Sequence, residues 1–228
     1  MKILVTGGGT SEDVDGVRRI TNMSTGSLAF EILQAFDGKG HELIYLQGLT
    51  AKLPEIASLR SYPCGGTQEV YDTMKELLTK EKIDVVVHAM AISDFTVGYV
   101  ITKDALAEEV SRAKNKEEIL RILNQPKLAL ERNQKISSSE ELILGLKKTV
   151  KILPELKKWN PDIFLVSFKL LRDVEKEELL AVARRQLNET NSNLVLANDF
   201  KELSMETHRA YLVNEEETME VIGKRNIA

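Results

Sequence analysis

Two short stretches near the N-terminus carry residue types that suit phosphate chemistry. A β-branched run ends in three glycines at residues 7–9, and a Ser-Thr-Gly turn occupies residues 24–26. Glycines at the end of a strand allow backbone N–H groups to approach an anion closely. The later turn opens an expected helix, whose first N–H groups and dipole favour phosphate. Together the two stretches predict an anion site at one end of a sheet.

Arg18 and Asn22 lie between these stretches and are four residues apart. A guanidinium binds phosphate through two N–H groups, and a carboxamide both donates to and accepts from a carboxylate or acyl oxygen. A plainer interpretation makes Asn22 a helix cap and Arg18 a solvated surface charge. The two residues alone leave both interpretations open.

Further polar residues follow other apolar runs. Asp94 comes shortly after the run at 84–88, Lys169 ends a second run and Asn198 a third. Open α/β sheets bind ligands beyond the carboxyl ends of their strands, so these side chains are expected to gather at one edge. Lys135 stands in a loop, where a lysine is usually solvated.

Strands that alternate with helices must position these residues. Strands are expected at 2–6, 42–46, 58–62, 84–88, 163–168, 194–197 and 211–213, and helices at 25–36, 68–80 and 175–187. This order predicts an α/β fold with a Rossmann-like, mostly parallel sheet flanked by helices, in one domain spanning residues 1–228. The interval 99–134 is charged and lacks a convincing buried strand. We expect a flexible insertion there, a lid or a dimer arm, before a helix that starts near Ser137.

Several other chemistries are disfavoured. The dinucleotide motif lacks its third glycine, no Gly-Lys-Ser/Thr follows the glycines, and Tyr71 of a Y-x-x-x-K match lies on an apolar helical face. Three scattered histidines and the single Cys64 predict no His/Cys metal site. A net charge of −4 argues against general nucleic-acid binding. No apolar run approaches the roughly 20 residues that span a bilayer, so a cytoplasmic protein is expected.

The ordered set of motifs resembles the phosphopantothenate–cysteine ligase family. The set consists of Gly8-Gly9-Thr10, Val17-Arg18, Asn22, Ser24-Thr25-Gly26, Ser93-Asp94, Lys135-Ile136, Pro161-Asp162-Ile163, Phe168-Lys169 and Asn198-Asp199. The resemblance implies a ligase of coenzyme A biosynthesis that joins 4′-phosphopantothenate to L-cysteine through an acyl-nucleotide. It further implies CTP or ATP as co-substrate, Mg²⁺ at the phosphates, and a stand-alone form without flavin.

The resemblance also implies roles for individual residues. Asn22 and Lys135 would be catalytic, Asn22 by stabilising the acyl-nucleotide and Lys135 from a mobile lid. Arg18 would reach a phosphopantothenate bound to the neighbouring subunit, which implies a homodimer. Substrate contacts fall on Arg18, Asn22, Ala91 and Asp94. Nucleotide contacts fall on Gly8, Ser24, Gly26, Met90, Asp94, Lys135, Phe168 and Lys169, and no metal ligand is assigned.

Three departures from the family pattern concern the nucleotide. Ser137 and Ser138 follow Lys135-Ile136 where bacterial members have lysines, Met90 replaces an alanine, and Gln186 and Thr190 fall where CTP-using members have lysines. CTP is favoured over ATP. Two alternatives stay open, an NAD(P)-dependent reductase or epimerase and a nucleotide-binding protein without turnover.

Overall fold

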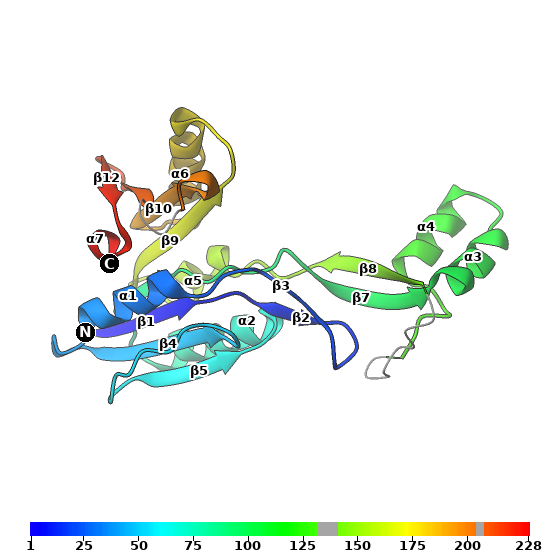
Figure 1. Cartoon of the computed structure of the whole chain (residues 1–228), viewed down its shortest axis with the longest axis horizontal. Helices are drawn as coiled ribbons and strands as arrows, with labels where there is room; N and C mark the ends of the chain where they lie inside the picture. Colours follow the sequence, from blue (N-terminus) through cyan, green and yellow to red (C-terminus); the bar gives the residue numbers. More distant parts are fainter. Residues whose placement is uncertain (132–140, 204–207) are drawn as a thin grey trace.

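A mostly parallel sheet of eight strands is the main feature of the computed structural model, which describes residues 1–131, 141–203 and 208–228 (Figure 1). Its strand order is β12-β11-β10-β9-β6-β1-β4-β5, parallel from β5 to β10 and antiparallel at β11 and β12. The strands are β1 (Lys2–Gly7), β4 (Glu42–Gly48), β5 (Arg60–Cys64), β6 (Val85–His88), β9 (Phe164–Leu171), β10 (Leu194–Asp199), β11 (Arg209–Val213) and β12 (Thr218–Ile222). The predicted fold class is confirmed, and each expected strand is present with ends that differ by a few residues.

Helices cover both faces of this sheet. They are α1 (Ser27–Phe36), α2 (Thr67–Lys80), α5 (Leu153–Trp159), α6 (Lys176–Thr190) and α7 (Lys224–Ile227), and a 3-10 turn, η1, spans Phe200–Glu202. Side chains alternate between faces along a strand, so Ile3 and Val5 pack against α1 while Leu4 packs against α2 and α5. Helix α6 packs on β10 and β11, and α7 lies against α1. No helix within the described ranges is long and apolar enough to cross a membrane.

One row of polar residues lies at the carboxyl edge of the sheet. Thr6 on β1, His88 on β6 and Ser167 on β9 are register partners, and all three are buried. Register partners in a parallel sheet point to the same face, which here is the face that α5 and α6 cover. The row therefore places three hydrogen-bonding side chains beneath the space between these two helices.

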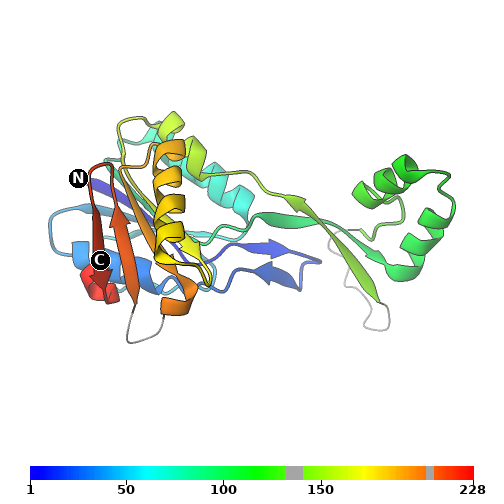
Figure 2. The same ribbon diagram turned by 90° about the horizontal axis from the view of Figure 1, so that it is seen from above.

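An arm projects from the sheet and consists of β7 (Phe95–Thr102), α3 (Lys103–Ser111), α4 (Lys116–Asn124) and β8 (Leu142–Lys148) (Figures 1 and 2). Strands β7 and β8 form a separate antiparallel pair. An insertion is thus present, but the expectation that 99–134 lacks a buried strand is wrong, because Val100 and Ile101 are buried. The helix start expected near Ser137 lies outside the described residues, and from Leu142 the chain forms strand β8 rather than a helix.

The arm strand escaped prediction because its apolar residues do not pack in the main core. Val97 and Val100 pack against Val14, Leu130 and Leu142, which form a small separate cluster. Val14 belongs to the loop of a two-stranded hairpin of β2 (Ser11–Asp13) and β3 (Arg19–Thr21). The hairpin that follows the three glycines therefore contacts the arm through apolar side chains.

Candidate active site

Two cavities open at the carboxyl edge of the sheet. One has a volume of about 550 Å³ and lies between α5 and α6 (the α6 cavity), and the other, of about 670 Å³, lies at the start of α1 (the α1 cavity). They share Met90, Phe168 and Leu170 as lining residues. The cavities thus lie on opposite faces of the sheet and adjoin across its edge.

The segment from Asn22 to Gly26 forms one wall of the α1 cavity. The Asn22 side chain is fixed there, because its Nδ2 donates to the Ala91 carbonyl at 3.0 Å. Its backbone N–H donates to the Thr10 carbonyl at 3.2 Å. Helix α1 begins after Gly26, so the interpretation of Asn22 as its cap is wrong. The side chain instead joins two loops that follow different strands.

The glycines serve close backbone packing in this wall. A Cβ on Gly9 would lie 2.4 Å from the Asn22 carbonyl oxygen, and a Cβ on Gly26 would lie 2.9 Å from the Gly8 nitrogen. Gly8 and Gly26 also have positive φ angles of 83° and 66°, which favour glycine. Gly26 and Ser24 line the α1 cavity, whereas Gly8 lies behind that wall. Backbone atoms of the chain itself therefore fill the space beside these glycines, where the sequence predicted an anion.

Met90 separates the two cavities, and a buried network holds its backbone. Its N–H donates to Thr6 Oγ1 at 3.1 Å, and that hydroxyl lies 2.9 Å from His88 Nδ1. Burial lowers the pKa of His88 to about 4, so the imidazole is neutral near pH 7. The sequence favours a strand-end or surface position for His88. His88 is the last residue of β6, as expected, but it is buried rather than on the surface, and it lines the α6 cavity.

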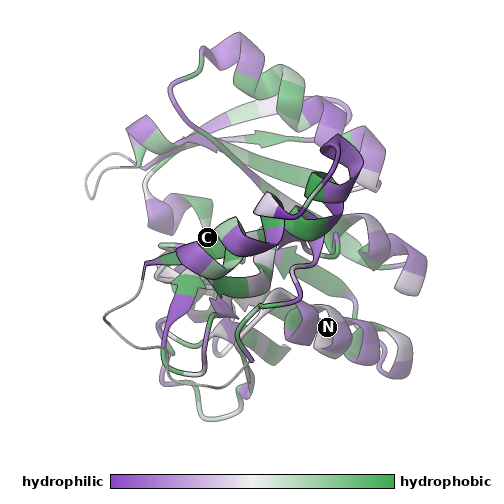
Figure 3. Cartoon of the chain, turned by 90° about the vertical axis from the view of Figure 1, so that its right-hand side faces the viewer, coloured by the Kyte–Doolittle hydropathy of each residue, from purple (hydrophilic) through white to green (hydrophobic). Residues whose placement is uncertain are grey.

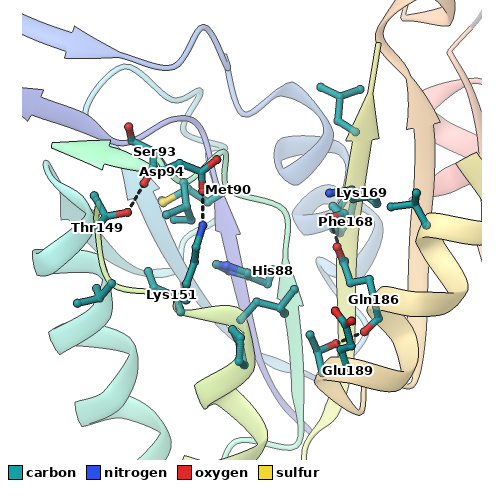
Figure 4. Close-up of a pocket in the computed structure, with 18 of the residues that line it drawn as sticks. His88, Met90, Ser93, Asp94, Thr149, Lys151, Phe168, Lys169, Gln186 and Glu189 are labelled. Carbon is teal, nitrogen blue, oxygen red and sulfur yellow. Dashed lines mark hydrogen bonds and ion pairs between the residues drawn. The ribbon is translucent and has the colours of Figure 1, made fainter. Parts of the chain in front are cut away.

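Charged side chains line the α6 cavity. Asp94 Oδ1 lies 2.5 Å from Lys151 Nζ, and both side chains are largely exposed at the mouth. Figure 4 shows this pair on one wall and Lys169, Phe168 and Gln186 on the other. Gln186 Nε2 donates to Ser167 Oγ at 3.0 Å and to the Phe168 carbonyl at 3.2 Å. Lys151 was missed because it lies 57 residues from Asp94, and only the return of the arm brings the two together.

The structure brings most of the predicted site residues to these cavities. Asn22, Ser24, Gly26 and Ala91 line the α1 cavity, Asp94 and Lys169 line the α6 cavity, and Met90 and Phe168 line both. Arg18 lies apart, in the loop between β2 and β3, where it pairs with Asp15 at 2.6 Å. Lys135 lies outside the described residues. His208 and Lys224, which sequence reasoning did not select, line the α1 cavity near the C-terminus.

The disfavoured chemistries find no support among the described residues. Within the described ranges, no group of three His, Cys, Asp or Glu side chains could hold a metal ion. Burial raises the pKa of the Cys64 thiol, which opposes thiolate formation. Tyr71 packs edge-on against Trp159 with ring centroids 4.9 Å apart, in a core position. The polar and charged side chains that line the two cavities are suited to binding and positioning ligands.

The fold and the two adjoining cavities define an α/β protein with a ligand site at the carboxyl edge of a parallel sheet. The chain belongs to the family described as DNA/pantothenate metabolism flavoprotein, C-terminal domain, whose model matches residues 1–130 and 125–228. This membership confirms the resemblance found in the sequence.

Individual relatives agree with this assignment. The chain is similar to a crystal structure of the DNA/pantothenate metabolism flavoprotein from Streptococcus pneumoniae, with 37% identity, a TM-score of 0.85, and coverage of 100% of this chain and 94% of that one. It is 30% identical over 212 residues to the coenzyme A biosynthesis bifunctional protein CoaBC of Thermococcus kodakarensis, covering 93% of this chain and 44% of the relative. The CoaBC protein of Methanocaldococcus jannaschii is 26% identical, with 98% and 47% covered. The chain thus spans about half the length of these curated relatives.

A more distant structure shares the fold. The Cab2 mutant H337A in complex with phosphopantothenate-cysteine superposes with a TM-score of 0.70 at 19% identity, covering 99% of this chain and 83% of that one.

Proposed function

We propose that this chain is a ligase that joins 4′-phosphopantothenate to L-cysteine through an acyl-nucleotide, a step of coenzyme A biosynthesis. One observation carries the proposal: two cavities of sufficient size for two substrates adjoin at Met90, next to the fixed amide of Asn22. A reaction between a nucleotide and a carboxylate requires such adjoining compartments, because positioning supplies much of the rate. The family membership and the phosphopantothenate-cysteine bound to Cab2 support the choice of substrates.

The reaction proceeds in two displacements. A carboxylate oxygen of phosphopantothenate attacks the α-phosphorus of the nucleotide, and pyrophosphate leaves. The cysteine amine then attacks the acyl carbon, the nucleotide monophosphate leaves, and the amine loses a proton. Asn22 stabilises the acyl-nucleotide by hydrogen bonding, with Ala91 and Asp94 contacting the substrate beside it. Lys135 is proposed to contribute charge from the segment after residue 131.

The α6 cavity is proposed to take the nucleotide's charged part. Lys151, Lys169 and Arg185 line it and would offset phosphate charge. Its carboxylates, Asp94 and Glu189, suit Mg²⁺, because this ion takes one or two carboxylates and otherwise binds phosphate oxygens and water. When bound, the ion would neutralise phosphate charge. We propose that the nucleotide is CTP rather than ATP. Neither displacement transfers electrons, so the proposed reaction requires no flavin. We also propose that the protein is located in the cytoplasm.

A homodimer is proposed through the arm. Leucines 120 and 123 on α4 and 144 and 146 on β8 are 40–52% exposed, and α4 buries none of its residues. Figure 3 views the chain from the arm side and shows apolar residues interleaved with polar ones along its helices. A second copy of this chain would cover these side chains and bring Arg18 to the neighbouring site. Light scattering at several concentrations tests this, with Leu123→Glu expected to yield monomers.

A coupled assay tests the ligase. The protein is incubated with 4′-phosphopantothenate, MgCl₂ and either CTP or ATP, pyrophosphate is measured, and L-cysteine is then added. We expect pyrophosphate release and, after cysteine, the amide product, with CTP the better substrate. Absence of pyrophosphate with both nucleotides would reject the ligase. Hydride transfer from NADPH would instead support a reductase or epimerase, and nucleotide binding without product a non-catalytic protein.

A further inference from the structure

The two cavities differ in the charges that line them. Carboxylates and cations are mixed in the α6 cavity, where Asp94 lies 2.5 Å from Lys151. Of the described residues that line the α1 cavity, none is an aspartate or glutamate, and Lys224 is the one lysine or arginine. Burial and the charge of Lys224 lower the pKa of His208, which lines the same cavity, so its imidazole is neutral near pH 7. The α1 cavity therefore carries one positive charge that its own walls do not offset.

Lys224 lies at the start of helix α1. It is half-buried, and its Nζ donates at 2.9 Å to Ser27 Oγ, on the first residue of that helix. Within the described ranges, no carboxylate lies at ion-pair distance from this ammonium. The helix begins after Gly26, which has no side chain to bond the first N–H groups, and its first turn contains no acidic residue. An ammonium and the positive end of a helix dipole thus lie together, an arrangement that a bound anion would stabilise.

Asn198 adds a buried amide to the same cavity. Its side chain lines the cavity although the residue is only 7% exposed. The preceding residue, Ala197, packs with α6, so Asn198 faces the side of the sheet that carries α1. Its neighbour Asp199 accepts the N–H groups of Val174 and Lys201, each at 2.8 Å, which fixes this end of β10.

The side-chain amide of Asn198 has no hydrogen-bond partner among the residues that the structure describes. Buried polar groups are nearly always hydrogen-bonded, to protein or to water. An amide that is held in place and unpaired at a cavity wall is therefore available to a bound molecule, and its NH₂ group can donate to an oxygen atom.

We propose that Lys224, Asn198 and the first N–H groups of α1 form a subsite for a phosphate group of a substrate, an inference that rests on the proposed ligase activity. The ammonium supplies charge, and the amide and the helix N–H groups donate hydrogen bonds to the phosphate oxygens. Both anionic substrates, 4′-phosphopantothenate and the nucleotide, carry this group. Because the α6 cavity offers three cations to the nucleotide, we expect the phosphate of 4′-phosphopantothenate in this subsite.

Equilibrium binding tests the subsite without requiring turnover. Isothermal titration calorimetry measures the Kd of 4′-phosphopantothenate, of pantothenate, which lacks the phosphate, and of CTP for wild type, Lys224→Gln and Asn198→Asp. Each substitution should weaken binding of 4′-phosphopantothenate at least about tenfold, the size of one charge-assisted hydrogen bond, and leave pantothenate unchanged. Lys224→Arg keeps the charge and should retain most of the affinity.

Arg225→Gln is the matched control, because it removes a positive charge one residue away, from a side chain that is 91% exposed. This variant should bind every ligand with wild-type affinity. Thermal melting verifies that each variant folds. If Asn198→Asp does not fold, Asn198→Ala replaces it and should lose the same hydrogen bond.

The ligands distinguish the two sources of phosphate. A loss of affinity for CTP in place of 4′-phosphopantothenate would support the subsite and assign it to a nucleotide phosphate. Wild-type affinity of Lys224→Gln for both phosphorylated ligands would overturn the inference, as would equal losses for pantothenate or equal losses in Arg225→Gln. Wild-type protein that binds neither phosphorylated ligand would also overturn it. Wild-type protein that binds 4′-phosphopantothenate but releases no pyrophosphate would instead reject the proposed ligase activity and leave the subsite in place.

Discussion

Replacing Asn22 with aspartate tests the proposed centre of the site with a change of almost no volume. The Asn22 amide donates through Nδ2 to the Ala91 carbonyl at 3.0 Å, which holds two loops of the α1 cavity together. A carboxylate cannot donate this bond and would place an anionic oxygen against the carbonyl oxygen. It would also bring a negative charge to a site that, in the proposed reaction, must accommodate the phosphate of an acyl-nucleotide.

The magnitude follows from Coulomb's law. Two unit charges at about 4 Å repel by about 4 kcal/mol at an effective dielectric constant of about 20, the value typical near a protein surface. Such a penalty on the transition state lowers turnover about a thousandfold. Asn22→Ala adds no charge and loses a hydrogen bond worth about 1 kcal/mol, so a loss of about fivefold is expected. The two variants should therefore differ by at least a hundredfold.

Pyrophosphate release and amide formation, measured under saturating substrates, give the comparison. Asn188→Asp, on the exposed side of α6, controls for an added charge elsewhere, and thermal melting verifies that each variant folds. Wild-type turnover in Asn22→Asp would remove Asn22 from the mechanism. Equal losses in the aspartate and alanine variants would refute the electrostatic argument and leave only the loss of the loop contact.

Three further predictions concern the fold. Met74 is fully buried between α2 and the sheet, so replacing it with alanine should lower the free energy of unfolding by about 2–5 kcal/mol. Met219 is 52% exposed, so the same replacement there should lower it by less than about 0.5 kcal/mol. Urea denaturation measures both changes. Hydrogen bonds from Arg60 hold the pKa of Glu81 at about 2, below its ordinary value of 4.5, so the stability it contributes is present above about pH 4.5 and is lost as pH falls toward 2. Glu81→Gln should therefore flatten the stability profile in that window, and an unchanged profile would contradict the pairing. Burial raises the pKa of Tyr45 to about 12, and its buried hydroxyl has no partner among the described residues, so Tyr45→Phe should leave the melting temperature equal or higher.

The apolar pattern predicted the central strands best where burial on both faces is nearly complete, as in β1. The residues of β1 from Ile3 to Gly7 are all buried, and a strand covered on both faces shows as a continuous apolar run. In strand β8, by contrast, five of the seven residues are exposed and none is buried, and two of its leucines face solvent. The apolar residues of an exposed strand do not form the continuous run of a buried strand, so the sequence of β8 could not be distinguished from that of a loop.

Contacts between distant segments could not be predicted. The Thr6–His88 and Asp94–Lys151 contacts join residues 82 and 57 positions apart, and each forms only because the sheet order places their strands or loops together. Asp15 escaped notice for another reason. A carboxylate three residues before an arginine gives no sign in the sequence that it is buried, and the Asp15 side chain is only 2% exposed.

The two cavities follow from the alternation of side chains along a strand. Ser167 on β9 points to the face that carries α6, and the next residue, Phe168, packs on the face that carries α1. Adjacent residues at the end of one strand therefore face opposite sides of the sheet, and the two cavities adjoin only at the edge of the sheet. Met90 occupies that edge, tethered through its own N–H to Thr6. A sheet that ends in this way offers two ligands separate cavities that meet at Met90. In the proposed reaction, the carboxylate bound in one cavity would reach the phosphorus atom bound in the other at this boundary.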